Sequence, residues 1–129
     1  KEQNQALYAS ASYTDAGWKP FSFMFPAISM LHTPTVTITL KSDVDFILRI
    51  DLGDINNVSA NMNELTTFVK ASDKFETYTF DFTGKFFQLY PTFAKVDQSN
   101  IDKIFIYANP GKTYSGTIVI DNLIIGKKP

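Results

Sequence analysis

The chain has 129 residues, no cysteine, and 12 basic against 13 acidic residues, which leaves a net charge of −1 at pH 7. This length suffices for one domain that buries a core without disulfides. The near-zero charge argues against nucleic acid as a partner, because that binding depends on clustered Lys and Arg, and no apolar run approaches the ~18 residues that a membrane-spanning helix needs.

Aromatic and β-branched residues alternate with polar ones along most of the chain, which is typical of half-buried strands. Eight candidate strands span residues 5–13, 18–25, 35–41, 44–51, 65–70, 75–82, 100–108 and 115–125. Since each sheet has an apolar face that must be covered, this series predicts an all-β fold, a two-sheet antiparallel β-sandwich. The longest stretch without a pattern, residues 54–63, is predicted to be a loop at one end.

Alternation also assigns side chains to faces, because successive side chains of a strand point to opposite sides. The predicted inward-facing aliphatic residues of three strands are Val36, Ile38, Leu40, Leu48, Ile50, Leu52, Ile104, Ile106 and Ala108. The outward positions of two of these strands then carry Ile47, Arg49, Asp51, Lys103, Phe105 and Tyr107. In the predicted strand over residues 75–82, the aromatic residues Tyr78, Phe80 and Phe82 are predicted to face inward.

Several short motifs carry a family resemblance. The chain contains an Asn109-Pro-Gly111 turn followed by Gly116-Thr-Ile-Val-Ile-Asp121, and earlier Lys41-Ser-Asp43 followed by Leu48-Arg-Ile-Asp-Leu-Gly-Asp54. Over residues 17–126 the chain resembles the jelly-roll carbohydrate-binding modules that are appended to secreted bacterial glycoside hydrolases. The resemblance implies a jelly-roll, galactose-binding-domain-like sandwich over residues 1–126, with residues 127–129 beginning a linker.

The resemblance further implies a function. We expect a non-catalytic module that binds plant β-glycan chains, namely β-glucan, xylan or mannan. It would hold a catalytic domain of the same polypeptide near its polymer and so raise that enzyme's effective concentration. The expected location is outside the cell or at the cell surface. Because the chain begins at Lys1 without a signal peptide, we expect it to be excised from a longer precursor.

A sugar site needs flat aromatic faces for stacking and planar polar groups for hydroxyls. The candidate ligand-binding residues are Trp18, Arg49, Asp51, Tyr90, Phe105 and Tyr107. Four of them form one set if their strands share the concave sheet, with Trp18 or Tyr90 as the stacking platform. Two alternatives stay open: Arg49 and Asp51 as a solvent-exposed cross-strand pair, and Trp18 as a plug at the end of the sandwich. Tyr114 is predicted to be a loop residue.

The resemblance also implies a structural Ca²⁺ held by an acid of the final strand, which here is Asp121, and by the amino-terminal segment. The only acid available at the first strand is Glu2. Calcium takes six to eight oxygen ligands, so a single carboxylate does not define a site. The alternative is that Asp121 bridges strands by hydrogen bonds.

Catalytic signatures are missing from the sequence. The only histidine, His32, precedes Thr33-Pro34 in a predicted turn, and no Gly-x-Ser-x-Gly, His-Glu-x-x-His or phosphate-binding glycine loop is present. The expectation is therefore that the chain is not an enzyme. Two rival interpretations remain: a non-binding spacer domain of a secreted multidomain protein, and a small glycan-cleaving enzyme that uses carboxylate pairs such as Asp43 with Asp45 or Asp51 with Asp54.

Overall fold

The computed structural model describes residues 20–59, 65–86 and 94–126, and the backbone of residues 7–13. All regular elements of these residues are strands, as predicted. Their bounds are β1 Leu7–Tyr13, β2 Phe21–Ile28, β3 Thr35–Ser42, β4 Phe46–Asp54, β5 Thr66–Val69, β6 Glu76–Asp81, β7 Ile101–Ala108 and β8 Tyr114–Ile125. This part of the chain contains no helix that is long and apolar enough to cross a membrane.

The eight predicted strands are confirmed, but β2 and β4 end three residues later than the sequence pattern indicated. Strand β2 continues past Phe25 although Pro26 has no N–H to donate, because an edge strand tolerates proline where the N–H would face solvent. The register of β2 with β7 shifts between Met24 and Ile28. Strand β4 runs three residues beyond Asp51, and Asp54 still pairs with Ile101 of β7. The predicted loop after β4 therefore begins later than the sequence pattern indicated.

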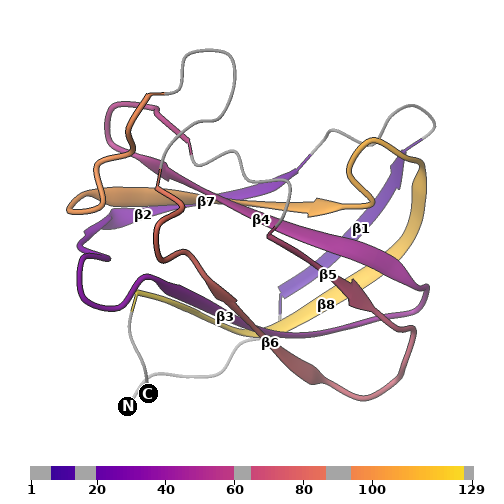
Figure 1. Cartoon of the computed structure of the whole chain (residues 1–129). Helices are drawn as coiled ribbons and strands as arrows, with labels where there is room; N and C mark the ends of the chain where they lie inside the picture. Colours follow the sequence, from indigo (N-terminus) through magenta and orange to yellow (C-terminus); the bar gives the residue numbers. More distant parts are fainter. Residues whose placement is uncertain (1–6, 14–19, 60–64, 87–93, 127–129) are drawn as a thin grey trace.

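The strands form two four-stranded sheets, and every described pairing is antiparallel. We call β1-β8-β3-β6 the first sheet and β2-β7-β4-β5 the second sheet. Strands that are distant in sequence alternate within each sheet, which is the strand order of a jelly roll. Figure 1 shows the two sheets stacked as layers, with β2, β7 and β4 above β3 and β8.

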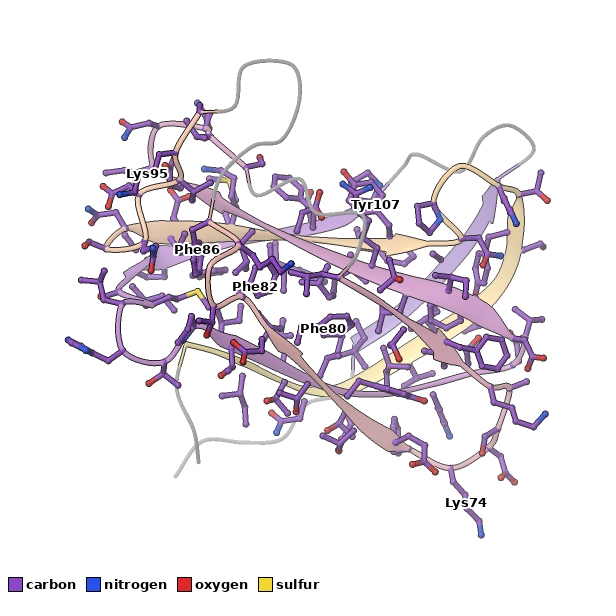
Figure 2. The ribbon with its side chains drawn as sticks, viewed as in Figure 1. Lys74, Phe80, Phe82, Phe86, Lys95 and Tyr107 are labelled. Atoms are coloured by element: carbon purple, nitrogen blue, oxygen red, sulfur yellow. The ribbon has the colours of Figure 1, made fainter. Side chains whose placement is uncertain are left out.

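The core lies between the inner faces of the two sheets. The nine aliphatic residues that alternation assigned inward are all fully buried. Phe80, Phe82 and Phe86 lie between the layers in Figure 2, and the Phe82 and Phe86 ring centres are 5.7 Å apart. Tyr78 is only partly buried and packs against this core.

The prediction that Tyr114 is a loop residue is wrong. Tyr114 is the first residue of β8 and is buried, and its ring meets Phe46 edge-on with the ring centres 5.6 Å apart. The turn that precedes it is tightened by Asn109, which has a φ of 52° and whose side-chain oxygen accepts from the Ile47 amide at 2.8 Å. The turn is thus fastened to the start of β4, which brings Tyr114 against Phe46.

Candidate functional site

The second sheet brings four of the predicted site residues together on its outward face. In the register of β4 and β7, Arg49 lies opposite Tyr107 and Asp51 lies opposite Phe105. Paired residues of neighbouring strands share a face, and the inward positions between them are filled by core residues. Figure 2 shows Tyr107 on the side of the second sheet that faces away from Phe80 and Phe82. We call this surface the aromatic face; it carries Ile47, Arg49, Asp51, Phe105 and Tyr107.

Arg49 and Asp51 form a buried, bidentate ion pair on the aromatic face. The Arg49 Nε donates to Asp51 Oδ1 and its Nη2 donates to Oδ2, each at 2.9 Å, and the two side chains are only 4% and 6% exposed. The Arg49 guanidinium carbon lies 5.0 Å from the centre of the Tyr107 ring. The predicted alternative of a solvent-exposed cross-strand pair is therefore wrong, since both residues belong to β4 and alternation places i and i+2 on one side.

Burial on the aromatic face raises the pKa of both Asp51 and Tyr107. Burial raises the pKa of Asp51 above its ordinary 3.8, and the hydrogen bonds and positive charge of Arg49 offset only part of that effect. Burial also raises the pKa of the Tyr107 phenol above 10.0; the negative charge of Asp51 acts in the same direction, and the positive charge of Arg49 acts against it. Tyr107 therefore keeps its hydroxyl proton at neutral pH, and such a phenol hydroxyl can both donate and accept hydrogen bonds.

Two exposed apolar residues on the second sheet extend the aromatic face, and the sequence analysis did not name either of them. Phe68 of β5 pairs with Ile47 of β4, and Met24 of β2 pairs with Lys103 of β7. Phe68 is 55% exposed and Met24 is 74% exposed. The signal for Met24 was present in the alternation of β2, because inward Phe23 and Phe25 leave residue 24 outward. For Phe68 it was weak, because β5 has only four residues.

Gly53 makes room for the Lys103 side chain beside Phe105. A Cβ at Gly53 would lie 2.6 Å from Lys103 Cγ and 3.3 Å from Phe105 Cε2. With no side chain there, the Lys103 ammonium reaches the Asp54 carbonyl oxygen and the Asp102 carboxylate, each at 2.6 Å. The aliphatic part of Lys103 therefore packs over Gly53 and completes the surface next to Phe105.

Asp54 anchors the loop that follows β4. Its Oδ1 accepts from the amides of Asn56 at 2.8 Å and Val58 at 2.9 Å, and its Oδ2 accepts from the amide of Asp97 at 2.7 Å. These bonds join the loop after β4 to the segment before β7. Asp54 is buried, so its carboxylate has a structural role that the sequence analysis did not assign.

The carboxylate pairs that a small hydrolase would use are committed to other bonds. Asp51 is paired with Arg49, and Asp54 accepts three backbone amides. Asp43 accepts the Thr117 amide at 2.8 Å, and Asp45 accepts the Ala71 amide at 2.6 Å. A glycoside hydrolase needs two carboxyl groups that flank one glycosidic bond, whereas these four carboxylates bind Arg49 or backbone amides.

A pocket of about 550 Å³ lies away from the aromatic face. It is lined by Lys41, Ser42, Asp43, Ala71, Ser72, Asp73, Thr117 and Val119. None of these residues is aromatic, so the pocket lacks the stacking surface that a pyranose ring requires. The aromatic face, which carries Phe105 and Tyr107, is thus the better candidate for a sugar site.

Three predicted site residues remain to be placed. Trp18 and Tyr90 lie outside the described residues, as does Glu2. Asp121 is partly buried within β8, at the point where the register of β8 with β3 shifts. The described residues contain no group of three or more His, Cys, Asp or Glu that would hold a metal ion. The Ca²⁺ site at Asp121 therefore stays a prediction.

Comparisons with known proteins give a likeness in structure. No protein-family model matches the sequence, and no curated protein does. The family 11 carbohydrate-binding module of the cellulosomal cellulase Lic26A-Cel5E of Clostridium thermocellum matches with a TM-score of 0.54 and 18% identity, over 95% of this chain and 82% of that one. The chain has the jelly-roll fold of carbohydrate-binding modules.

Two further structures support that fold. A Clostridium thermocellum family 11 module in complex with a β-1,3-1,4-mixed-linked tetrasaccharide matches with a TM-score of 0.55 and 17% identity, over 94% of this chain and 83% of that one. An exo-β-agarase matches with a TM-score of 0.57 and 12% identity, over 96% of this chain but only 23% of that one. The predicted two-sheet jelly-roll sandwich is therefore confirmed.

Proposed function

We propose that the chain is a non-catalytic carbohydrate-binding module that binds a single β-glycan chain on the aromatic face. The observation that carries the proposal is the set of Phe105 and Tyr107 beside the buried Arg49–Asp51 pair. Aromatic rings stack on the apolar C–H side of a pyranose, and neighbouring polar groups select its hydroxyls. The expected polymer class is β-glucan first, with xylan and mannan as alternatives. A module in complex with a mixed-linkage tetrasaccharide among the similar structures supports this order.

The Arg49–Asp51 pair has a specific role in this proposal, which is to hold Tyr107. The planar guanidinium lies under the Tyr107 ring at 5.0 Å and is fixed by two bonds to Asp51. A ring held in this way loses little freedom when a sugar stacks on it, which lowers the cost of binding. The buried pair thus acts through Tyr107, and Phe105 supplies the adjacent stacking surface.

Attachment to a glycoside hydrolase and a location outside the cell belong to the same proposal. A domain that binds a polymer without cleaving it is useful when it raises the local concentration of a linked catalytic domain. In a polypeptide that carries both, removal of the module should slow the hydrolysis of an insoluble β-glycan while the hydrolysis of a small soluble substrate stays unchanged.

Affinity electrophoresis tests the proposal against its rivals. The protein is run in native gels that contain mixed-linkage β-glucan, xylan or mannan, with a gel without polysaccharide as the reference. We expect retardation by β-glucan and no release of reducing sugar. Normal migration in every gel would support the non-binding spacer domain instead, whereas release of reducing sugar would support the small hydrolase.

A further inference from the structure

Apolar side chains form a stripe across the second sheet, exposed at its ends in Phe68 and Met24 and half-buried in its middle at Phe105 and Tyr107. The large hydrophobic residues that are exposed in the described part of the chain are Met24, Leu31, Ile47, Ile55, Phe68 and Phe75. Three of these six lie on the outward face of the second sheet, and two of the three stand on its edge strands β2 and β5. Exposed apolar residues on an edge strand favour unwanted association and are usually avoided. Three exposed apolar residues on one face therefore indicate a binding surface.

The register defines the direction of this stripe. Phe68 lies level with Ile47, Tyr107 is level with Arg49, and Phe105 is level with Asp51. Met24 lies level with Lys103, which in turn pairs with Gly53. From β5 to β2 the apolar side chains thus descend one step of the face at a time. The stripe runs diagonally across the strands and reaches both edges of the sheet.

The stripe has the length of an oligosaccharide. Three strand spacings of about 4.8 Å and six residues of about 3.4 Å separate Phe68 from Met24, which gives a diagonal of roughly 25 Å, or about five pyranose units in an extended chain. Phe105 and Tyr107 alone are two residues apart on one strand, roughly 7 Å, which is about one to two units on the same scale. A surface of the larger size leaves both ends of the bound segment open at the sheet edges.

We propose that Phe68 and Met24 are ligand-binding residues at the two ends of a site about five sugar units long, with Phe68 as a stacking platform and Met24 as a smaller apolar contact. The inference rests on the proposed function and deepens it. Its occupant is the same β-glycan chain, because the two residues continue the surface of Tyr107 and Phe105 without a gap in register. The competing interpretation is that Phe68 merely stabilises the pairing of β5 with β4 through Ile47.

Binding of mixed-linkage β-glucan oligosaccharides of two to six units, measured by calorimetry, tests the inference. For the wild type, affinity should rise with each unit up to about five and then level off. Phe68→Ala should weaken binding of the hexasaccharide roughly tenfold and leave binding of the disaccharide unchanged, because the loss of one stacked ring acts only on a chain that reaches it. Phe68→Tyr should restore the wild-type value, and Met24→Ala should show a loss of the same kind but smaller.

The matched control is Phe75→Ala. Phe75 is 40% exposed, comparable with Phe68, but it lies beyond the second sheet, beside Lys41 of β3. Its removal should leave all affinities unchanged. If Phe68→Ala lowers only the melting temperature and binds the hexasaccharide like the wild type, the inference is wrong while the proposed function stands. If the wild type binds no oligosaccharide and no polymer, both are wrong.

Discussion

The two outward faces of the sandwich differ far more than its two inward faces. Inward, both sheets present buried aliphatic residues. Outward, strands β3 and β6 of the first sheet present what we call the threonine face: Thr37 and Thr79 with their hydroxyl oxygens 3.5 Å apart, and Thr39 and Thr77 at 2.8 Å. The second sheet presents the aromatic face instead. The fold requires only the inward faces, so the difference between the outward faces reflects something other than folding.

The threonine face is what a solvent-exposed sheet surface needs for stability alone. Threonine is favourable in strands, and cross-strand threonine pairs satisfy each other's hydroxyls. The aromatic face carries features that folding does not reward. Removing Arg49 and Asp51 from water costs more than a similar apolar pair would, and Phe68 and Met24 remain exposed. A surface that bears such costs on one sheet, beside a plain surface on the other, is the argument for a binding site there.

Breaking the buried ion pair should have the largest effect on stability. Arg49→Ala leaves Asp51 buried without its partner, so we expect the free energy of unfolding to fall by about 3 to 5 kcal/mol. Urea denaturation monitored by tyrosine fluorescence measures it. Replacing both residues, Arg49→Met together with Asp51→Leu, should recover most of this loss, because well-packed apolar residues can substitute for a buried pair. A loss below about 1 kcal/mol for Arg49→Ala would contradict the burial of the pair.

Removing the Tyr107 ring should have the largest effect on binding. Tyr107→Ala should weaken polysaccharide affinity by roughly 1 to 3 kcal/mol, the scale of a stacked ring with its hydrogen bond. The domain should stay folded, because Tyr107 points away from the core. Phe105→Ala should have a smaller effect on affinity. Calorimetric titration with the polymer that retards the wild type measures both.

Tyr78→Ala is the control for that prediction on the other sheet. Tyr78 belongs to β6 and packs against the core, so its removal should lower the melting temperature and leave affinity unchanged. The opposite result, in which Tyr107→Ala unfolds the domain and the remaining native fraction binds normally, would show that the sugar site lies elsewhere.

The sequence predicted the fold well, because alternation depends only on local order. Leu48, Ile50 and Leu52 point inward since every second residue of a strand does, whatever its partners are. The resemblance in the motifs around Asn109 and Asp54 supplied the jelly-roll arrangement that alternation cannot give. Tyr114 was misjudged because its burial depends on contact with Phe46, a residue 68 positions earlier in the chain.

The site was predictable only in part, for the same physical reason. Alternation placed Arg49 and Asp51 on one side of β4, but the contact of Arg49 with Tyr107 depends on the long-range register of β4 with β7. Phe68 was missed because β5 is too short for a pattern to identify its outward face. Properties that arise from pairing between distant strands were therefore the ones that sequence reasoning could not reach.

The pH dependence of stability should have opposite signs on the two sheets. Asp51 has a raised pKa, so the folded state binds its proton more tightly than the unfolded state does, and stability falls as pH rises from 3.8 through the raised value. Asp81 of β6 has a lowered pKa, because its Oδ1 accepts from the Thr83 hydroxyl at 2.6 Å and the Thr83 amide at 2.9 Å. The stability that Asp81 contributes is therefore lost as pH falls below 3.8.

Unfolding curves of the wild type, Asp51→Asn and Asp81→Asn separate the two effects. They are measured from about pH 3 to about pH 7, a range that includes the pH at which an ordinary carboxyl group titrates. As pH rises, the wild type should lose stability relative to Asp51→Asn, by about 1.4 kcal/mol for each unit by which the pKa is raised. Relative to Asp81→Asn it should gain stability, and by less, because Asp81 is exposed. If the stability of the wild type changed with pH in the same way relative to both variants, Asp51 would not be buried as the structure shows.

The smallest effect is expected on the threonine face. Thr39→Val removes the 2.8 Å hydrogen bond to the Thr77 hydroxyl but keeps the β-branched shape that suits a strand. Water can solvate the hydroxyl that is left, since Thr77 is exposed, so the free energy of unfolding should change by no more than about 0.5 kcal/mol. Polysaccharide affinity, measured in the same gels as for the wild type, should not change at all. A weakened interaction with Thr39→Val would mean that the first sheet also contacts the polymer, and the contrast between the two faces would then no longer identify the site.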